Sequence, residues 1–445
     1  MKLTQNYIKI CLDNYLKESV LINTLYGFVD ILSESEEKVF SKWEKCDNIL
    51  PCNEDEEVLL SQLLNKKYIY DELQENEYKD NLVEKLELKH KKKLENMHSA
   101  TFVLTYDCNF SCPYCFEKDN NNLSKIITED MVDKIFELHN NQIENITLFG
   151  GEPLLLTNKN IINYIIAKGK FSTYYVITNG YYLEEYFDIL SKSKIGYIQV
   201  TLDGTEHEHN KYRTLKNGKD TYSKILKGIE LFLKNNYKVR IRMNISKDNV
   251  EYYLKARDEL RDIFKSYEDN LFFELQPIFQ MENKNRDEIN NELISTDFSD
   301  ADYKIKNLHS NTIISLYPGL LGSIIKGVPM QPKFCSCDAD MNGYIYDSNG
   351  DIYLCLLAVG QKNKSIGEYF PKYFIRENTM LNRTIKTIKE CSNCKYALLC
   401  GGGCAYAAIN KNGDIYKPYC KTFLSELYNT KHLLSVRNGK DSYNE

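Results

Sequence analysis

The middle third of the chain repeats short apolar runs and longer amphipathic stretches. Six apolar runs have the length of strands, at Thr101–Tyr106, Asn145–Phe149, Thr173–Thr178, Tyr197–Leu202, Val239–Ile245 and Phe272–Phe279. Stretches of helical periodicity separate most of them, for example Thr128–Asn140 and Tyr222–Lys234. This alternation predicts an α/β fold whose parallel sheet is closed or partly closed, with the chemistry at the carboxyl ends of the strands.

The first 88 residues predict a small winged-helix-like domain. A possible hairpin spans Leu21–Leu32, and Ser33 lies three residues before Glu36, a spacing typical of a capping box at a helix start. A second helical pattern, Glu57–Leu64, and a short apolar run follow. This part has 10 Lys and 19 Asp or Glu, a net charge of 10 − 19 = −9, which disfavours DNA binding. Residues 89–98, rich in lysine, are expected to form a solvated linker or the end of a helix.

The last third predicts a different kind of domain. Tyr344–Tyr353 has the pattern of a hairpin, with Ser-Asn-Gly-Asp at its turn. Little regular secondary structure is expected around it, although many cysteines lie there. Small domains of this kind are held together by metal centres. We therefore divide the remaining chain into a barrel at residues 99–315 and a bridging and cysteine-rich region at residues 316–445.

The composition is that of an ordinary globular protein. Of 445 residues, 42% are hydrophobic and 27% charged, which excludes collagen-like and wholly disordered proteins. No apolar run reaches about 18 residues, and the N-terminus carries charges where a signal peptide would be apolar. The net charge of −6 suits a phosphate backbone poorly. We expect a cytoplasmic protein with no nucleic-acid and no membrane partner.

The fourteen cysteines are grouped, and their grouping predicts metal centres. Cys11, Cys46 and Cys52 are isolated near the start. The others form a tight trio and a C-terminal set, namely Cys108, Cys112 and Cys115, followed by Cys335, Cys337, Cys355, Cys391, Cys394, Cys400, Cys404 and Cys420. Thiols of a protein without an export signal stay reduced, so such groups indicate metal or redox chemistry rather than disulfides.

The trio places three thiolates on one short loop directly after the first predicted strand. Three ligands at the spacing Cys108-x3-Cys112-x2-Cys115 suit a cubane [4Fe–4S] cluster whose fourth iron stays open. A structural zinc site takes four protein ligands, and no obvious fourth lies nearby. Three unligated thiols are the remaining alternative. The pattern therefore favours an iron–sulfur cluster with one open iron.

This loop resembles the signature of the radical S-adenosylmethionine (radical SAM) superfamily, and Tyr114 before the last cysteine also fits it. The resemblance implies that Cys108, Cys112 and Cys115 are the catalytic cluster ligands and that SAM chelates the open iron. It implies further that the reduced cluster cleaves SAM to methionine and a 5′-deoxyadenosyl radical, which takes a hydrogen atom from the substrate. The implied fold is a partial (β/α)6 barrel, and the implied class is an oxidoreductase.

Further segments at predicted strand ends resemble the SAM-binding residues of that superfamily. Gly150-Gly151-Glu152-Pro153 is similar to the GGE motif, whose backbone and acid meet the methionine amino group, and an anion there suits an ammonium. The stretch His209–Arg213 resembles an HDKYR-like segment of peptide- and protein-modifying members, which implies that Arg213 meets the SAM carboxylate. The other cofactor candidates are Thr178, Asn179 and Asn244. His207 and His209 are expected to bond locally.

The C-terminal cysteines resemble the SPASM domain, which binds two auxiliary [4Fe–4S] clusters. The resemblance assigns Cys391, Cys394, Cys400 and Cys420 to one cluster, and Cys355 and Cys404 with Cys337 and Cys335 to the other. The Cys335-x-Cys337 spacing departs from the commoner wider one, so one of this pair remains a candidate free thiol that would leave an iron open for a substrate thiol. A zinc module stays the alternative. Three [4Fe–4S] clusters and SAM are thus expected.

The N-terminal domain resembles, more loosely, the PqqD-like element with which maturases of ribosomal peptides recognise their substrates. The matching residues are Asn23, Gly27, Val29 and Ile31 of the hairpin, with the helix that starts at Ser33. Such an element binds a leader peptide by adding a strand to its sheet edge. An uninvolved cap domain stays the alternative.

Three functions are compatible with these patterns. The first is a radical SAM/SPASM maturase that crosslinks a ribosomally made precursor peptide, for example through a thioether, with a reductant such as flavodoxin or ferredoxin. The second is an anaerobic sulfatase-type maturase, which oxidises Cys or Ser of a folded protein to formylglycine. Those relatives carry an Asp that acts as a base directly after the cysteine of Gly-x4-Cys. This chain has Leu356 there, although Asp338 or Asp340 could substitute. The third is a non-catalytic iron–sulfur or zinc scaffold.

Overall fold

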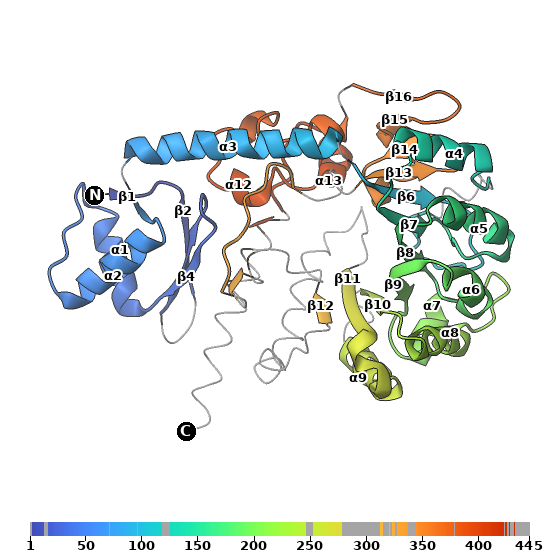
Figure 1. Ribbon diagram of the computed structural model, residues 1–445. Helices are drawn as coiled ribbons and strands as arrows, with labels where there is room; N and C mark the ends of the chain where they lie inside the picture. The colour runs from blue at the N-terminus through green and yellow to red at the C-terminus, as the bar shows by residue number, and fades with distance from the viewer. Residues whose placement is uncertain are drawn as a thin grey trace.

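A computed structural model describes most of the chain. The described residues are 2–12, 17–70, 72–95, 97–117, 125–245, 252–277, 312–314, 320, 323–324, 327–336, 343–377, 379–421, 423–424, 427 and 431. Figure 1 shows a small N-terminal domain, a long helix that leads from it, and a large sheet with helices along its outer side. Among the described residues, no helix has the length and apolar character needed to cross a membrane.

The N-terminal domain is a three-stranded antiparallel sheet with two helices on one face. Its elements are β1 (Lys2–Leu3), β2 (Tyr7–Cys11), β3 (Ser19–Asn23), β4 (Val29–Leu32), α1 (Glu34–Trp43), α2 (Glu54–Asn65) and β5 (Ile69–Tyr70), with sheet orders β2-β3-β4 and β1-β5. At the start of α1, the hydroxyl of Ser33 accepts the N–H of Glu36 at 3.3 Å, and the Glu36 carboxylate accepts the N–H of Ser33 at 2.8 Å. The predicted capping box is therefore present.

A single helix, α3 (Glu72–Glu95), connects this domain to the large sheet. Residues 89–95 form its last part, so the lysine-rich segment is a helix end that connects the two parts of the chain. The segment is rich in lysine, which favours helix, and Lys91 forms an ion pair of 3.0 Å with Glu87, one turn earlier. Figure 1 shows α3 running from the N-terminal domain along the cysteine-rich region to the sheet.

The large sheet has a parallel centre built as the strand–helix alternation predicts. Its strands are β6 (Ser99–Val103), β7 (Asn145–Phe149), β8 (Thr173–Thr178), β9 (Lys194–Thr201), β10 (Val239–Ile245), β11 (Leu271–Pro277) and β12 (Thr312–Ile314), each beside its predecessor. The helices between them are α4 (Glu129–Leu138), α5 (Lys159–Lys168), α6 (Leu183–Leu190), α7 (Glu206–Tyr212), α8 (Tyr222–Lys234) and α9 (Tyr253–Ile263). The apolar side chains between sheet and helices form the main core.

The predicted C-terminal hairpin joins this sheet instead of forming a separate one. Its strands β13 (Tyr344–Asp347) and β14 (Asp351–Tyr353) are antiparallel, and β13 pairs in parallel with β6. The sheet continues with β15 (Gly367–Glu368) and β16 (Phe374–Ile375), and the helices α12 (Ala397–Cys400) and α13 (Ala405–Asn412) follow. Short 3₁₀ turns lie at Leu156–Asn158, Lys265–Asn270, Leu356–Ala358, Lys362–Lys364, Met380–Asn382 and Lys389–Cys391.

The N-terminal domain packs directly on the cysteine-rich region. Ile8, Val20 and Ile22 of its sheet share a hydrophobic cluster with residues such as Met330 and Leu399. A second cluster joins Leu25 and one side of α3 to Phe334, Ile388 and Cys391, among others. A close approach occurs at Gly27, whose carbonyl accepts the N–H of Met330 at 2.7 Å. Gly27 has φ +74°, and a Cβ there would lie 1.9 Å from the Met330 carbonyl oxygen, so only glycine fits.

Candidate active site

Cys108, Cys112 and Cys115 lie on the loop that follows β6, at the carboxyl end of the parallel strands. The N–H of Phe110 donates to Sγ of Cys108 at 3.4 Å, which turns the loop back on itself. Hydrogen bonds to the segment after α7 hold the loop in place, from Ser111 N–H to the Thr214 carbonyl at 3.2 Å and from Lys216 N–H to the Asn109 carbonyl at 2.9 Å. The trio is thus fixed between two strand-end loops.

The electrostatics of the trio favour a bound cationic group. Burial raises the pKa of Cys108 to about 12 and that of Cys115 to about 11, and it raises the pKa of Cys112 as well. The guanidinium of Arg213 acts in the opposite direction on all three thiols. Thiolates in such a place need a metal to compensate their desolvation. Three sulfur donors on one loop, beside a buried arginine, fit a [4Fe–4S] cluster with an open iron.

Gly150 and Gly151 allow the loop after β7 to approach the cysteine loop. The N–H of Gly151 donates to the Thr105 carbonyl at 2.9 Å, and that of Glu152 donates to the Asp107 carbonyl at 2.8 Å. A Cβ on Gly150 would lie 2.3 Å from the Thr105 oxygen, and one on Gly151 would lie 2.4 Å from the Asp107 oxygen. Side chains at either glycine would push the two loops apart.

Glu152 is buried where the ends of β7 and β8 meet. Its Oε1 accepts the N–H of Leu154 at 2.8 Å and the hydroxyl of Thr178 at 2.6 Å, and its Oε2 accepts the N–H of Asn179 at 2.7 Å. Burial raises the pKa of Glu152 to about 7 against these hydrogen bonds and Arg213. Pro153, the other predicted residue here, accepts the Asn158 amide at its carbonyl. The carboxylate is thus positioned rigidly, and no cationic side chain among the described residues forms an ion pair with it.

Asn179 and the cysteine loop are also in contact. Its Nδ2 donates to Oδ1 of Asn109 at 2.8 Å and lies 3.8 Å from Sγ of Cys108. Because Asn179 is adjacent to Thr178, one strand end contacts both the carboxylate and the cluster loop. The predicted residues Glu152, Thr178 and Asn179 are therefore brought together at the trio.

Arg213 and Tyr114 meet at a buried carboxylate that the sequence analysis did not assign, Asp203. The hydroxyl of Tyr114 donates to Asp203 and accepts from Nη1 of Arg213 at 3.1 Å. Nη1 of Arg213 lies 3.7 Å from Asp203, and the N–H of Asn244 donates to Oδ1 of Asp203 at 2.8 Å. Asp203 thereby links three predicted residues. Its position directly after a predicted strand was a usable signal.

His209 holds this group in place, as expected of a locally bonded histidine. Its Nδ1 accepts the N–H of Asp203 at 3.3 Å, and its Nε2 lies 3.0 Å from the hydroxyl of Thr221, which itself donates to the Arg213 carbonyl at 2.6 Å. Burial lowers the pKa of His209 well below its usual value. The imidazole is therefore neutral, with its proton on Nε2.

Four C-terminal cysteines lie close enough to influence one another electrostatically, namely Cys391, Cys394, Cys400 and Cys420. The pKa of Cys391 is raised to about 12 by burial and then by Cys394, Cys400 and Cys420, and burial raises the pKa of Cys400 to about 11. Arg383, which sequence reasoning missed, is buried beside them and donates to the carbonyls of Gly402, Gly403, Ile415 and Lys417 at 2.7–3.1 Å. These four thiols are the set that the SPASM resemblance assigned to one cluster.

The structure does not gather the remaining cysteines in the same way. Cys335 is buried, with its Sγ 4.0 Å from Nδ1 of His90 on α3. Cys355 and Cys404 are partly buried against the barrel core, and Cys337 lies outside the described residues, as do Asp338 and Asp340. Among the described residues, no three His, Cys, Asp or Glu side chains lie close enough to hold one metal ion.

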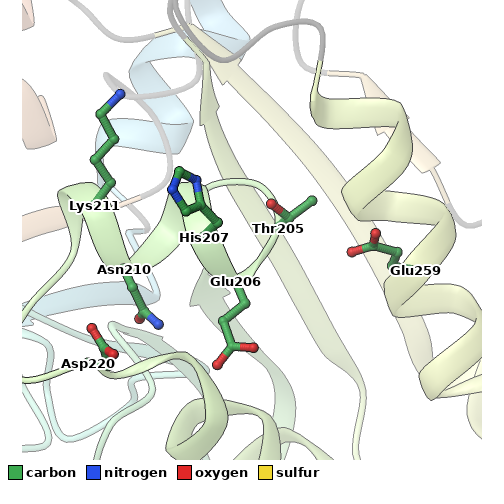
Figure 2. Close-up of a pocket in the computed structure, with 7 residues that line it drawn as sticks. All are labelled: Thr205, Glu206, His207, Asn210, Lys211, Asp220 and Glu259. Carbon is green, nitrogen blue, oxygen red and sulfur yellow. The ribbon is translucent and has the colours of Figure 1, made fainter.

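A separate polar hollow of about 640 Å³ lies beside α7 (Figure 2). Its lining residues come from α7, from the segment before α8 and from α9, and they are Thr205, Glu206, His207, Asn210, Lys211, Asp220 and Glu259. Figure 2 shows His207 and Lys211 on one side of α7 and Glu206 on another. None of the predicted site residues lines it.

Comparisons with known proteins agree with this geometry. Residues 102–260 match the profile of the radical SAM superfamily. A cysteine-type anaerobic sulfatase-maturating enzyme of Clostridium novyi (strain NT) is 26% identical over 72% of this chain and 91% of its own. The solved structure of native anSMEcpe with bound AdoMet and Cp18Cys peptide matches 76% of this chain and 99% of its own (TM-score 0.58, 20% identity). Streptococcus suis SuiB bound to precursor peptide SuiA matches 94% and 98% (TM-score 0.55, 16% identity).

These matches confirm the predicted α/β fold with its parallel-dominated sheet. They also make the protein an enzyme, so the scaffold alternative is set aside. Proteins of the matched superfamily use a [4Fe–4S] cluster and SAM, which agrees with the donor set of the trio.

Proposed function

We propose that the protein is a radical SAM enzyme that modifies a ribosomally made precursor peptide, and the match of residues 102–260 to that superfamily supports this. Cys108, Cys112 and Cys115 would hold the [4Fe–4S] cluster that binds SAM. Together these groups supply a radical that takes a hydrogen atom from the substrate. The reaction is a crosslink, for which a thioether is one product, and a reductant of the flavodoxin or ferredoxin type would supply the electron.

Opposite charges on two sides of the trio support SAM as the ligand. Glu152 and Arg213 are both buried and both act on the trio, Glu152 raising the pKa of Cys108 and Arg213 lowering it. In our proposal Glu152 receives the ammonium of SAM and Arg213 its carboxylate. Thr178 and the N–H of Asn179 orient Glu152, while Tyr114, Asp203 and Asn244 orient Arg213 and the adjacent strand end. Gly150, Gly151 and Pro153 shape the loop.

The observation that supports a peptide substrate is the open edge of β4, in a domain that packs against the cysteine-rich region. Among the described residues, β4 pairs only with β3. One face of this sheet is covered by α1 and α2 and the other by the C-terminal region. A peptide can therefore reach the sheet only by adding a strand to an edge. The structural matches agree with this proposal, since the peptide-bound SuiB structure covers 94% of the chain, whereas the anSMEcpe structure covers 76%.

The hydrogen-bond pattern of β4 identifies the donors that this edge offers. The N–H of Asn23 donates to the Phe28 carbonyl at 2.8 Å. Hydrogen-bonded and non-bonded pairs alternate in an antiparallel ladder, so Val29 and Ile31, opposite Ile22 and Val20, are non-bonded. Their N–H and C=O groups point away from β3, toward the open edge. A leader peptide would bind these groups.

Ile31→Pro is expected to weaken precursor binding about tenfold or more, because it removes one outward N–H and blocks the approach of a strand. It removes no bond of the β3–β4 ladder, so the melting temperature should change little. The measurement is the Kd of fluorescently labelled peptides synthesised from short reading frames beside the gene. Ile31→Ala is the matched control, since it removes the exposed side chain and keeps the N–H. Equal affinity of the proline variant and the wild type would exclude this edge as the binding site.

The C-terminal cysteines would hold two auxiliary clusters. Cys391, Cys394, Cys400 and Cys420 form one set, and Cys355, Cys404, Cys337 and Cys335 the other, with one of the last pair open to a substrate thiol. The support is the shared electrostatic environment of the first set. The role of these clusters would be to take up the electron left after the bond forms, or to bind the substrate thiolate.

Cys394→Ala is expected to leave SAM cleavage measurable and to suppress modified product, because only the auxiliary set loses a thiolate. Iron content should fall from about twelve to about eight per chain, since each cluster holds four irons. Iron and sulfide analysis after anaerobic reconstitution measures this loss. Cys11→Ala, which removes an exposed, isolated thiol, serves as the control. A Cys394 variant with full iron and full product would remove the auxiliary cluster from the proposal.

A second candidate, the maturation of a folded protein, rests on the similarity to the C. novyi sulfatase-maturating enzyme. Leu356 disfavours this function. It occupies the position at which the sulfatase-type maturases carry an Asp that acts as a base, and leucine cannot accept a proton. The mass of the product separates the two functions. A thioether crosslink removes two hydrogen atoms and keeps the sulfur, whereas formylglycine formation from cysteine replaces the sulfur with oxygen.

A further inference from the structure

The inner face of the large sheet carries polar side chains on β9, β10 and β11. Ile198 and Val200 of β9 and Ile241 of β10 are buried in the core beneath the helices. Side chains of a strand alternate between faces, so Gln199, Arg240 and Arg242 lie on the opposite face. Figure 1 shows this face turned away from α5, α6 and α8, toward the middle of the molecule.

Two arginines on this face differ in their surroundings. Arg240 forms an ion pair of 3.3 Å with Glu274, and its guanidinium lies 4.0 Å from the ring centre of Tyr197. Arg242, two residues on, has no hydrogen bond or ion pair within the part of the chain that the structure describes. Arg240 is therefore satisfied by the protein, whereas Arg242 is not.

The carboxylates near Arg242 are bound elsewhere. Asp203 accepts the N–H of Asn244 and the hydroxyl of Tyr114, and it forms an ion pair of 3.7 Å with Arg213. Burial lowers the pKa of Arg242, and Arg213 and Arg240 lower it further, against the attraction of Glu274 and Asp203. An arginine under these conditions gains from a carboxylate supplied by a ligand.

Gln199 adds a second unused donor. It is 3% exposed, and its Nε2 is buried with no hydrogen-bond partner among the described residues. In the sheet register Gln199 lies opposite Arg240, and Thr201, the next inward residue of β9, lies opposite Arg242. A buried amide donor without an acceptor is costly. The two donors are thus near neighbours on one face.

We infer that Arg242 and Gln199 form a binding site for a carboxylate of the peptide substrate, an acidic side chain or the C-terminal carboxylate, on the inner face of the barrel. This inference rests on the proposed function and adds the class of substrate group that the barrel accepts. The guanidinium of Arg242 binds the carboxylate in a charge-assisted pair, and the amide of Gln199 donates to it.

The carboxylate of SAM is assigned to a different arginine. Arg213 is influenced by all three cysteines of the trio, whereas the charges that influence Arg242 are Glu274, Asp203, Arg213 and Arg240. Arg213 and Arg242 both lower the pKa of Asp203, and Arg213 also lies within ion-pair distance of it, at 3.7 Å. The site at Arg242 is therefore separate from the arginine that the three thiols of the trio influence.

The test compares Arg242→Gln with Arg240→Gln in the reconstituted holoprotein. The probes are N-acetyl-L-glutamate and its neutral isostere N-acetyl-L-glutamine, with binding measured by NMR titration and thermal stability by calorimetry. We expect the wild type to prefer the glutamate probe about tenfold or more. Arg242→Gln should abolish this preference without lowering the melting temperature. Arg240→Gln should lower the melting temperature and keep the preference. Gln199→Leu should reduce the preference.

Two results would overturn the inference. One is an unchanged preference for N-acetyl-L-glutamate in Arg242→Gln, with a melting temperature as low as that of Arg240→Gln, which would make Arg242 structural. The other is that Arg242→Gln loses the discrimination between SAM and decarboxylated SAM, which would assign the carboxylate to the cofactor. A wild-type protein that does not cleave SAM would contradict the proposed function instead. The binding titration does not depend on SAM cleavage, so the two failures can be told apart.

Discussion

Replacement of Cys112 by alanine is expected to abolish SAM cleavage and to leave the C-terminal clusters filled. Cys112 is the central ligand of the trio, and a two-thiolate loop cannot hold a cluster with a single open iron. The four thiols around Cys394 lie on other elements and keep their contacts. The measurement is 5′-deoxyadenosine formed with dithionite and SAM, together with iron and sulfide content of the same anaerobic sample. About eight of about twelve irons per chain should remain, four for each auxiliary cluster.

The control for this variant is Cys46→Ala, since Cys46 is exposed and isolated near the N-terminus. It should form 5′-deoxyadenosine at the wild-type rate. If the Cys112 variant also formed 5′-deoxyadenosine, the assignment of the trio would be wrong. Roughly two zinc ions per chain with little iron, in the wild type, would contradict the iron–sulfur assignment itself.

Replacement of Glu152 by glutamine should weaken SAM binding by roughly 10- to 100-fold, because a charge-assisted hydrogen bond contributes about 1.5–3 kcal/mol. The glutamine keeps the volume of the side chain, and its oxygen can still accept from Thr178 and Leu154. Equilibrium dialysis of SAM against the anaerobic holoprotein gives the Kd. Thr157→Ala, on the turn after the same loop, is a nearby control. An unchanged Kd in the glutamine variant would exclude Glu152 as the partner of the ammonium.

The same carboxyl gives this binding a pH dependence of known sign. The pKa of Glu152 is raised to about 7, chiefly by burial. Below that pH the carboxyl is neutral and cannot attract an ammonium, so SAM affinity should fall as the pH drops from 8 to 6, by up to about tenfold per pH unit. For the free protein the sign is opposite, since a raised carboxyl pKa stabilises the fold at low pH. The glutamine variant should lack both dependences.

The parts of the fold that local patterns determine could be predicted from the sequence. The apolar runs predicted β7, β8 and β10 with their observed bounds, because a buried apolar residue recurs at about every second position of these strands. The first strand begins two residues earlier than predicted, since the polar Ser99 and the small Ala100 give only a weak apolar signal. Glu152, Thr178 and Asn179 were predicted on separate segments. They meet because the carboxyl ends of neighbouring parallel strands share one edge.

Contacts between distant segments had no such local signal. The pairing of β13 with β6 and the contact of Gly27 with Met330 depend on how whole regions pack. For residues 89–95 the sequence left a solvated linker and a helix end both open, because lysine is common in solvated linkers and on exposed helices. Asp203 directly follows a predicted strand, but its contacts with Tyr114 and Arg213 join the segment after β6 to the segment after β9. The difference between Arg240 and Arg242 likewise depends on which neighbours are already paired.

The pairing of β13 with β6 has a consequence for the order in which the protein is built. Tyr106, just after β6, donates to Asp347 at the end of β13 at 2.6 Å, across 241 residues of sequence. At about 5–20 residues per second, a ribosome needs roughly 12–50 s to synthesise the intervening chain. During that interval one edge of β6 has no neighbouring strand. The loop that carries Cys108 therefore follows a strand whose sheet is incomplete. We therefore expect cluster insertion at this loop to follow completion of translation.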